Sequence, residues 1–279
     1  MKIAIMMLVH KNENQTWRLI NHLSYDFDVF VHIDKKSKIK VESKNNVFVY
    51  KKYKTYWGSF NQIMATLYLL SEAHRKNYDR YILISGQDLP IKTNDEIKEF
   101  FKNNQSEYIQ IDKIPKEDGW PDMRRLTRYH VQRQYCSKEM KYNIPYRIQR
   151  KIFYVFSNLK PRKLDYEFYG GFNWTNYTHN CVEKIFEYLK NNKKYIKRYK
   201  WTECADEIFY QTIIYQIEGI NIINNCLRYV DWESGPERPR TLRINDYEKI
   251  MESSNLFARK FDETVDIEII EKIYETIEK

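Results

Sequence analysis

The chain of 279 residues predicts an α/β fold: a single domain, residues 1–279, built on a mainly parallel central sheet. Over the first 115 residues, apolar runs of strand length alternate with stretches whose apolar residues recur every three or four positions, which is typical of strand–helix–strand units. Hydrophobic residues make up 42% of the chain, enough for a substantial core. Only 7 glycines and 7 prolines occur, which indicates a compact fold with few linkers.

The elements can be placed in order along the chain. Strands are expected at residues 3–9, 29–33, 47–50, 81–84 and 108–111. Helices are expected around residues 17–23 and 63–70 and after the capping box of Thr93 and Glu96. A basic, partly helical insertion at 116–165 interrupts this alternation. Beyond it we expect helices at 182–189 and 205–216, a strand at 222–230 and a charged C-terminal helix.

One segment indicates where a ligand would bind. Residues 85–94, SGQDLPIKTN, follow the apolar strand at 81–84 and lead into the helix that begins near Thr93. They therefore lie at the carboxyl end of a buried strand, where open α/β sheets bind ligands because backbone groups there are unpaired and point outward.

Positive charge concentrates in the insertion. The formal net charge is +9, yet twelve Lys or Arg between Arg124 and Lys163 accompany a single acidic residue, Glu139. Ile148, Ile152, Val155, Phe156 and Leu159 recur there at helical spacing beside basic residues. This pattern is typical either of a core helix with a solvated basic face or of an amphipathic helix at an anionic lipid surface.

Several classes of protein lack support in the sequence. There is no GxGxxG, no P-loop and no zinc-type Cys/His spacing. Asp26 and Asp28 form a DxD triplet, a pattern typical of metal-binding nucleotide-sugar enzymes, but they enter a strand instead of leaving one, which favours chance or turn chemistry. Basic residues mixed with Tyr could bind nucleic acid, but no nucleic-acid motif accompanies them, so no nucleic-acid partner is expected.

Composition also bears on location. The longest apolar run, residues 3–9, is too short to cross a bilayer, and the four cysteines form no CxxC pair. We therefore expect a cytoplasmic protein, with the basic segment at the inner face of the plasma membrane as an open alternative.

Five motifs occur in an order that resembles the core-2/I-branching N-acetylglucosaminyltransferases, glycosyltransferase family 14. They are LVHKNENQTWRLINHL (8–23), VFVHIDKKS (29–37), WGS (57–59), ILISGQDLPIKT (82–93) and LFARKFD (256–262). The resemblance implies a GT-A-like fold with a Rossmann-like UDP-sugar-binding half at 1–115 and an acceptor and catalytic half at 166–279. It also implies inverting transfer from a UDP-sugar to a glycan or lipid-linked oligosaccharide, without a metal. The lack of an anchor and of a disulfide framework suggests a bacterial relative.

The same resemblance assigns the catalytic groups. Without a metal, Arg or Lys must stabilise the negative charge that develops on the departing diphosphate. By similarity these are Arg240 and Lys260, with Arg238 and Arg243 close enough to Arg240 for the register to shift. A carboxylate must take the acceptor hydroxyl's proton. Glu207, in an Asp-Glu pair that opens a helix, resembles the family's base.

Further site residues also follow from the resemblance. Glu203 is the alternative base if the register shifts. Asp34 resembles the family's uracil or ribose contact, and Val9 and His10 would line the base pocket. Asp88 stands where metal-dependent relatives carry their DxD motif, and would order the sugar pocket or cap the next turn. Trp174 would stack on the acceptor sugar or wall the cleft, or else belong to the core.

Overall fold

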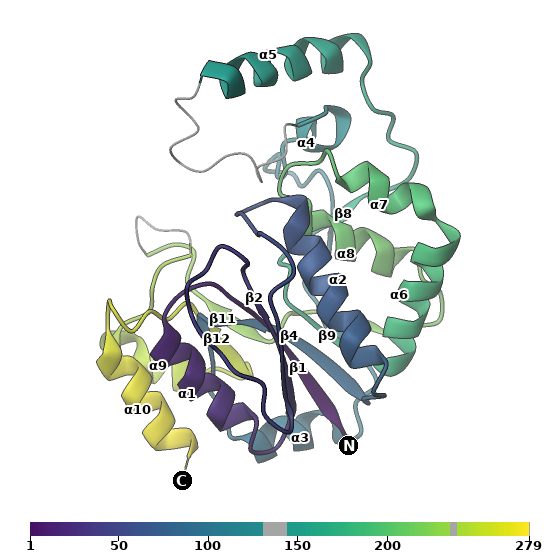
Figure 1. Ribbon diagram of the computed structural model, residues 1–279. Helices are drawn as coiled ribbons and strands as arrows, with labels where there is room; N and C mark the ends of the chain where they lie inside the picture. Colours follow the sequence, from purple (N-terminus) through teal and green to yellow (C-terminus); the bar gives the residue numbers. More distant parts are fainter. Residues whose placement is uncertain (131–143, 235–238, 279) are drawn as a thin grey trace.

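The computed structural model describes residues 1–130, 144–234 and 239–278, and its centre is a sheet of seven strands (Figure 1). The strand order is β10-β6-β9-β4-β1-β2-β3, and β9 runs antiparallel to both of its neighbours. These strands are β1 (Ile3–Val9), β2 (Asp28–Ile33), β3 (Val47–Tyr50), β4 (Arg80–Ser85), β6 (Glu107–Ile109), β9 (Thr175–Thr178) and β10 (Ile222–Asn224). The mainly parallel α/β sheet predicted from the sequence is confirmed, and the domain is GT-A-like.

Helices cover both faces of this sheet, because side chains of the buried strands alternate between two cores. In β1, Ile5 and Met7 enter one core, with α1 (Glu13–Leu23), α3 (Asn94–Lys102), α9 (Tyr247–Met251) and α10 (Ile267–Ile277). Ala4 and Met6 enter the other, with α2 (Phe60–His74), α6 (His179–Asn191), α7 (Lys193–Tyr199) and α8 (Asp206–Tyr215).

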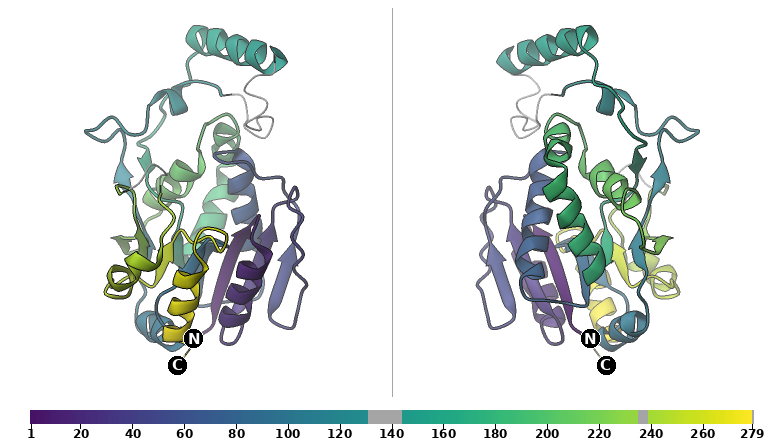
Figure 2. Two further views of the ribbon diagram at one scale, coloured as in Figure 1. Left: turned by 90° about the vertical axis from the view of Figure 1, so that its left-hand side faces the viewer. Right: turned by 90° about the vertical axis from the view of Figure 1, so that its right-hand side faces the viewer.

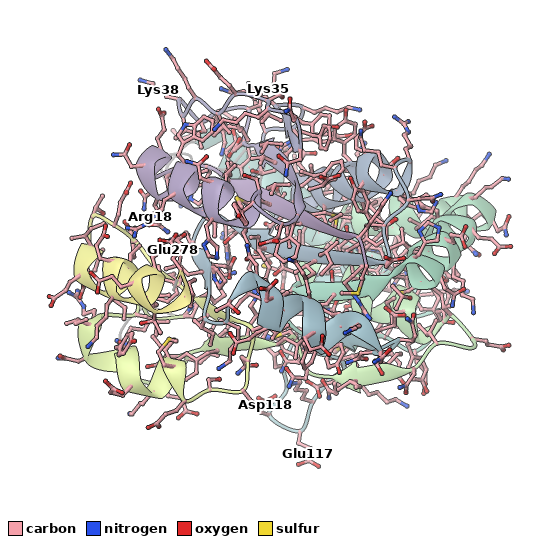
Figure 3. The ribbon with its side chains drawn as sticks, turned by 90° about the horizontal axis from the view of Figure 1, so that it is seen from below. Arg18, Lys35, Lys38, Glu117, Asp118 and Glu278 are labelled. Carbon is pink, nitrogen blue, oxygen red and sulfur yellow. The ribbon has the colours of Figure 1, made fainter. Side chains whose placement is uncertain are left out.

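The two ends of the chain come together beside the first core. Seen from below, α1 and α10 lie next to each other, with Arg18 and Glu278 between them (Figure 3). The Arg18 guanidinium sits 4.1 Å from the centre of the Tyr274 ring, and His22 lies 3.3 Å from a Glu278 carboxylate oxygen. The C-terminal helix therefore packs onto the N-terminal Rossmann-like half.

Smaller elements complete the domain. Strands β11 (Arg228–Val230), β12 (Phe257–Arg259) and β5 (Asp88–Pro90) form a second sheet, and β7 (Asp112–Lys113) pairs with β8 (Tyr169–Gly170). Short helices α4 (Arg124–Thr127) and η3 (Ile244–Asp246) lie in connections. Helix α5 (Ile144–Leu159) stands beyond the rest of the molecule, at the end opposite both termini (Figure 2).

Most predicted elements form, including the capping box of Thr93 and Glu96 at the start of α3. The strand predicted at 222–230 is wrong: it is two strands, β10 and β11, in different sheets. Local side-chain bonding explains the break. The Asn225 side-chain oxygen accepts from the Leu227 amide at 2.7 Å, and Leu227 adopts a φ of 56°, so the chain turns there.

Candidate active site

Several segments of the chain meet at the edge where the sequence predicts ligand binding. At the carboxyl ends of the parallel strands, the Asp34 amide donates to the Val9 carbonyl at 2.8 Å, and the Gly86 amide donates to the Leu8 carbonyl at 3.0 Å. The chain that leaves β12 joins them, because the Phe261 amide donates to the Gln87 carbonyl at 2.8 Å. Residues separated by more than two hundred positions therefore share one edge.

A polar clamp holds the C-terminal segment there. The Lys11 ammonium pairs with the Asp262 carboxylate, and the Asn12 side chain donates to that carboxylate at 2.8 Å. Burial disfavours the charge of Asp262, but hydrogen bonds from Lys11, Thr264 and Asn12 outweigh it and hold its pKa well below the usual range. The Gln15 amide adds a 2.8 Å bond to the Gly86 carbonyl.

The structure places the predicted nucleotide contacts at this edge. Asp34 is 5% exposed and accepts from the amides of Lys36 at 2.9 Å and Thr55 at 3.2 Å. Burial opposes its charge, yet these bonds and the Lys36 ammonium lower its pKa. Asp34 thus shapes the loop beside the edge, and its contact with uracil or ribose stays a prediction.

Val9 and His10 differ in what they could offer a ligand. The Val9 side chain is buried and lies under Gly86, so it supports the edge from below. His10 is exposed. Desolvation by the surrounding protein, followed by the positive charge of Lys11, lowers the pKa of its ring, so the neutral form is favoured. Of this pair, His10 is the one whose side chain can line a base pocket.

A buried charge cluster adjoins the edge, and two of its members were missed in the sequence. Asp88 is fully buried; its Oδ2 accepts from the Ser85 hydroxyl at 2.6 Å, and its Oδ1 lies 3.6 Å from Arg259 Nη1. Arg228 is also buried and donates to the Leu83 carbonyl at 2.5 Å. The Arg259 guanidinium lies 4.1 Å from the centre of the Trp174 ring.

This cluster revises two expectations. Asp88 does not cap the turn that follows it: its carboxylate accepts from Ser85 and so holds the preceding turn, and it neutralises Arg259. Within the described residues its Oδ1 and the Arg259 Nε have no hydrogen-bond partner. Unsatisfied buried polar atoms beside a predicted donor site are what a bound ligand or water would complete. Trp174 is 8% exposed, belongs to the second core and lies against Arg259, which agrees with its core alternative; stacking on an acceptor stays a prediction. In the sequence, the feature that could have identified Arg228 and Arg259 is the presence of an arginine in each of the apolar strands β11 and β12.

The two predicted diphosphate contacts have different surroundings. Lys260 follows β12 directly, and its carbonyl accepts from the Leu242 amide at 2.9 Å, so it lies at the clamped edge. Arg240 donates to Asp231 Oδ2 at 2.8 Å and to Asp246 Oδ1 at 2.7 Å. Hydrogen bonding to Asp246, followed by that to Asp231, raises the pKa of Arg240 against the effect of burial. Its guanidinium is thus already neutralised by two carboxylates. The alternative Arg243 is exposed, and Arg238 lies outside the described residues.

Glu207, the predicted base, opens α8, where a carboxylate is favoured by the helix dipole. Its Oε2 accepts from Arg125 Nη1 at 2.8 Å, and the side chain is 32% exposed. The preceding Asp206 is 7% exposed, so Glu207 is the more accessible of the pair. The alternative, Glu203, lies 3.5 Å from the His130 ring.

The loop before β9 ties this helix to the charge cluster. The Gly171 amide donates to the Glu207 carbonyl at 2.9 Å, and a Cβ atom at Gly171 would come within 2.1 Å of the Gln110 carbonyl oxygen. Only glycine fits at that distance. Trp174, three residues later, contacts Arg259, so the loop joins the predicted base to the buried charge cluster beside the predicted donor edge.

An aromatic pair near this loop was also missed. The rings of Phe172 and Trp232 stack with centroids 5.0 Å apart, and Trp232 is 39% exposed. The Phe172 carbonyl accepts from Gln211, one turn along α8 from Glu207, at 2.6 Å. An exposed aromatic face near a carboxylate suits a sugar ring, but contact across about sixty residues leaves no signal in the sequence.

The DxD triplet lies elsewhere. Asp26 accepts from Asn94 at 2.9 Å and pairs with Lys98, while Asp28 accepts from the Tyr78 hydroxyl. Both stand at the amino end of β2, opposite the candidate site, in agreement with turn and packing roles. In the described part of the chain, no three His, Cys, Asp or Glu side chains group as metal ligands.

Comparison with known proteins agrees with this geometry. The family model of the Core-2/I-branching enzymes matches residues 3–252. The chain therefore belongs to the Core-2/I-branching enzyme family, glycosyltransferase family 14, and is a glycosyltransferase. A search of curated proteins found no match. Among the described helices, none combines the length and apolarity that crossing a membrane requires.

Proposed function

We propose that this glycosyltransferase inverts the anomeric centre and needs no metal, moving GlcNAc from UDP-GlcNAc to a glycan or lipid-linked oligosaccharide. The observation that carries the proposal is the clamped edge. There Asp262 pairs with Lys11 and Phe261 bonds to Gln87, so the segment that contains Lys260 is held at the end of β1, to which Asp34 also bonds. The same domain carries an accessible carboxylate, Glu207. The same arrangement would serve UDP-xylose, UDP-galactose or UDP-glucuronate, since one or two substituents decide donor choice.

Each step has a residue in this site. Glu207 takes the proton of the acceptor hydroxyl as its oxygen attacks the anomeric carbon. The bond from that carbon to the diphosphate oxygen breaks on the opposite face, which yields a β-linkage and UDP. Lys260 stabilises the charge that collects on the diphosphate. Arg125, bonded to Glu207, fixes the direction in which the carboxylate points.

Arg240 is the second diphosphate contact that the family implies. Its two carboxylate partners oppose the approach of an anion, so a direct contact requires that Asp231 or Asp246 release it. The biological setting we propose is bacterial surface polysaccharide synthesis, in the cytoplasm at the inner face of the plasma membrane, where a lipid-linked acceptor would be presented.

Calorimetry of UDP and a panel of UDP-sugars in EDTA tests the proposal. Binding that survives EDTA, favours one sugar and weakens at least tenfold in Lys260→Ala is expected, because a charge-assisted contact contributes about 1.5–3 kcal/mol. The exposed Lys249 of α9 provides a matched control, and Lys249→Ala should bind normally. Binding only with manganese would refute metal independence, and no UDP binding at all would refute the donor assignment.

A further inference from the structure

Helix α5 (Ile144–Leu159) is unusual because it packs on so little of the protein. Figure 1 shows it beyond α4 and α7, and both side views in Figure 2 keep it clear of the central sheet. An amphipathic helix in a globular domain normally turns its apolar stripe toward the core. In α5, most of that stripe faces away from the protein.

The exposed fractions identify the stripe. Its residues recur at spacings of three and four, so they share one face of the helix. They are Ile144 at 68%, Ile148 at 55%, Ile152 at 60%, Val155 at 50%, Phe156 at 46% and Leu159 at 77%. Six large apolar side chains about half exposed or more, side by side, form a patch of the kind that marks an interaction surface.

A different face of α5 holds it to the domain. Ser157 is buried, and its hydroxyl accepts from the Tyr129 amide at 2.9 Å. The Phe153 ring lies 5.4 Å from that of Trp201. Phe153 and Ser157 lie on a second line along the helix, so these contacts leave most of the apolar stripe facing outward. Of the stripe, Phe156 also contacts the domain, with its ring centroid 5.5 Å from that of Tyr129.

The charge around the stripe indicates the kind of surface that it would bind. Between residues 144 and 163 there are six basic residues and no acidic one. Arg147, Arg150 and Lys151 are exposed on the helix itself, and Lys160 and Lys163 follow it. Apolar side chains flanked by positive charge complement an anionic lipid surface, where hydrocarbon and headgroup charge lie at adjacent depths.

We propose that α5 docks the enzyme on an anionic membrane, with the stripe inserted at the level of the headgroups. An apolar groove of about 290 Å³ continues from the stripe toward the domain, lined by Tyr129, Ile152, Phe153, Phe156 and Trp201. It offers hydrocarbon a place beneath the helix. The core-helix alternative fails for the stripe, because its side chains are exposed.

The position of α5 relates membrane docking to the proposed active site. The segment that leads toward it contains α4, whose Arg125 bonds to Glu207. A membrane surface under α5 would therefore lie on the side of the proposed base, where a lipid-linked acceptor must arrive. This last step rests on the proposed function, whereas membrane binding itself does not.

Vesicle flotation without donor or acceptor tests the proposal. The full chain should float with vesicles of phosphatidylcholine and phosphatidylglycerol, and remain in the soluble fraction with phosphatidylcholine alone. Arg150→Ala/Lys151→Ala should weaken binding about 30-fold, because each basic side chain near an anionic surface contributes roughly a fivefold gain. Lys193→Ala/Lys194→Ala removes two exposed charges from α7 and serves as the matched control, with binding unchanged.

The apolar part is tested by Ile148→Ser/Leu159→Ser, two exposed positions whose replacement should leave folding intact and abolish flotation. Calorimetry of UDP with the same variant reports separately on the active site and should be unaffected. Absence of flotation by the parent chain with anionic vesicles overturns the proposal. Sedimentation that shows a dimer broken by Ile148→Ser/Leu159→Ser, without vesicle binding, would identify the stripe as a contact between copies instead.

Discussion

Arg240 is the residue at which the family resemblance and the observed geometry predict different experimental results. The resemblance makes it a diphosphate contact, so its replacement should weaken UDP binding. The structure makes it the centre of an ion-pair triad, with bonds of 2.7–3.0 Å to Asp231 and Asp246. On the geometry alone, its replacement should mainly destabilise the segment that leads to Lys260.

The size of that effect follows from burial. The Arg240 side chain is 20% exposed and both carboxylates are 14% exposed. Exposed ion pairs contribute about 0–1 kcal/mol, whereas breaking a buried pair costs about 3–5 kcal/mol. A largely but incompletely buried triad lies between these limits, so Arg240→Met should lower the free energy of unfolding by roughly 2 kcal/mol.

Urea-induced unfolding followed by circular dichroism measures this loss, and calorimetry of UDP in EDTA measures the competing effect. Lys249→Met, at an exposed lysine of α9, is the control and should change neither quantity. The triad interpretation predicts reduced stability with UDP affinity within about threefold of the parent chain. Parental stability combined with a UDP affinity at least tenfold weaker would refute it and restore Arg240 as a direct ligand contact.

Three further predictions concern the base, the acceptor side and pH. Glu207→Gln should lower kcat by about 100-fold or more with little change in UDP affinity, because general bases contribute about 10²–10⁴-fold; parental turnover would exclude it as the base. Trp232→Ala should raise KM for the acceptor and leave UDP binding intact, with Phe172→Ala showing the same pattern in steady-state kinetics if the stacked pair binds a sugar. Burial lowers the pKa of His32 to about 4, and its neutral Nε2 accepts from the Tyr53 amide at 3.0 Å. Since the folded pKa lies below the unfolded value of about 6.5, this stabilisation is present above pH 6.5 and is lost as pH falls toward 4, by up to about 3 kcal/mol. Urea titrations of the parent chain and His32→Gln across that range should converge at low pH.

Local periodicity predicted most of the fold because the central strands are buried on both faces and the helices carry strong apolar stripes. Residues 3–9 and 81–84 could be placed from composition alone, and both strands formed. The prediction of one strand at 222–230 was wrong because the hydrogen bond from the Leu227 amide to the Asn225 side chain turns the chain there. Hydrophobic patterning does not detect such a local side-chain contact.

The site was less predictable because much of it depends on pairs distant in sequence. Asp88 could be named from its place after a strand, but its partner Arg259 is brought there by the pairing of β5 with β12. The ion pairs of Arg240 with two carboxylates could not be predicted either, since a single sequence does not indicate which acidic residue will pair with a given arginine. Arg125 was counted only among the basic residues of the insertion, and its bond to Glu207 could not be predicted from the sequence.

These pairs explain how one domain can carry chemistry on both halves. The proposed donor edge is built by the N-terminal strands, and the segment of Lys260 is held there by the ion pair of Lys11 with Asp262 and by the bond from the Phe261 amide to the Gln87 carbonyl. The proposed base belongs to α8 and is joined to that edge by the loop from Gly171 to Trp174. A sugar transferred between the halves would therefore move between groups fixed by charge-compensated contacts, which is the rigidity that stabilisation of a developing charge requires.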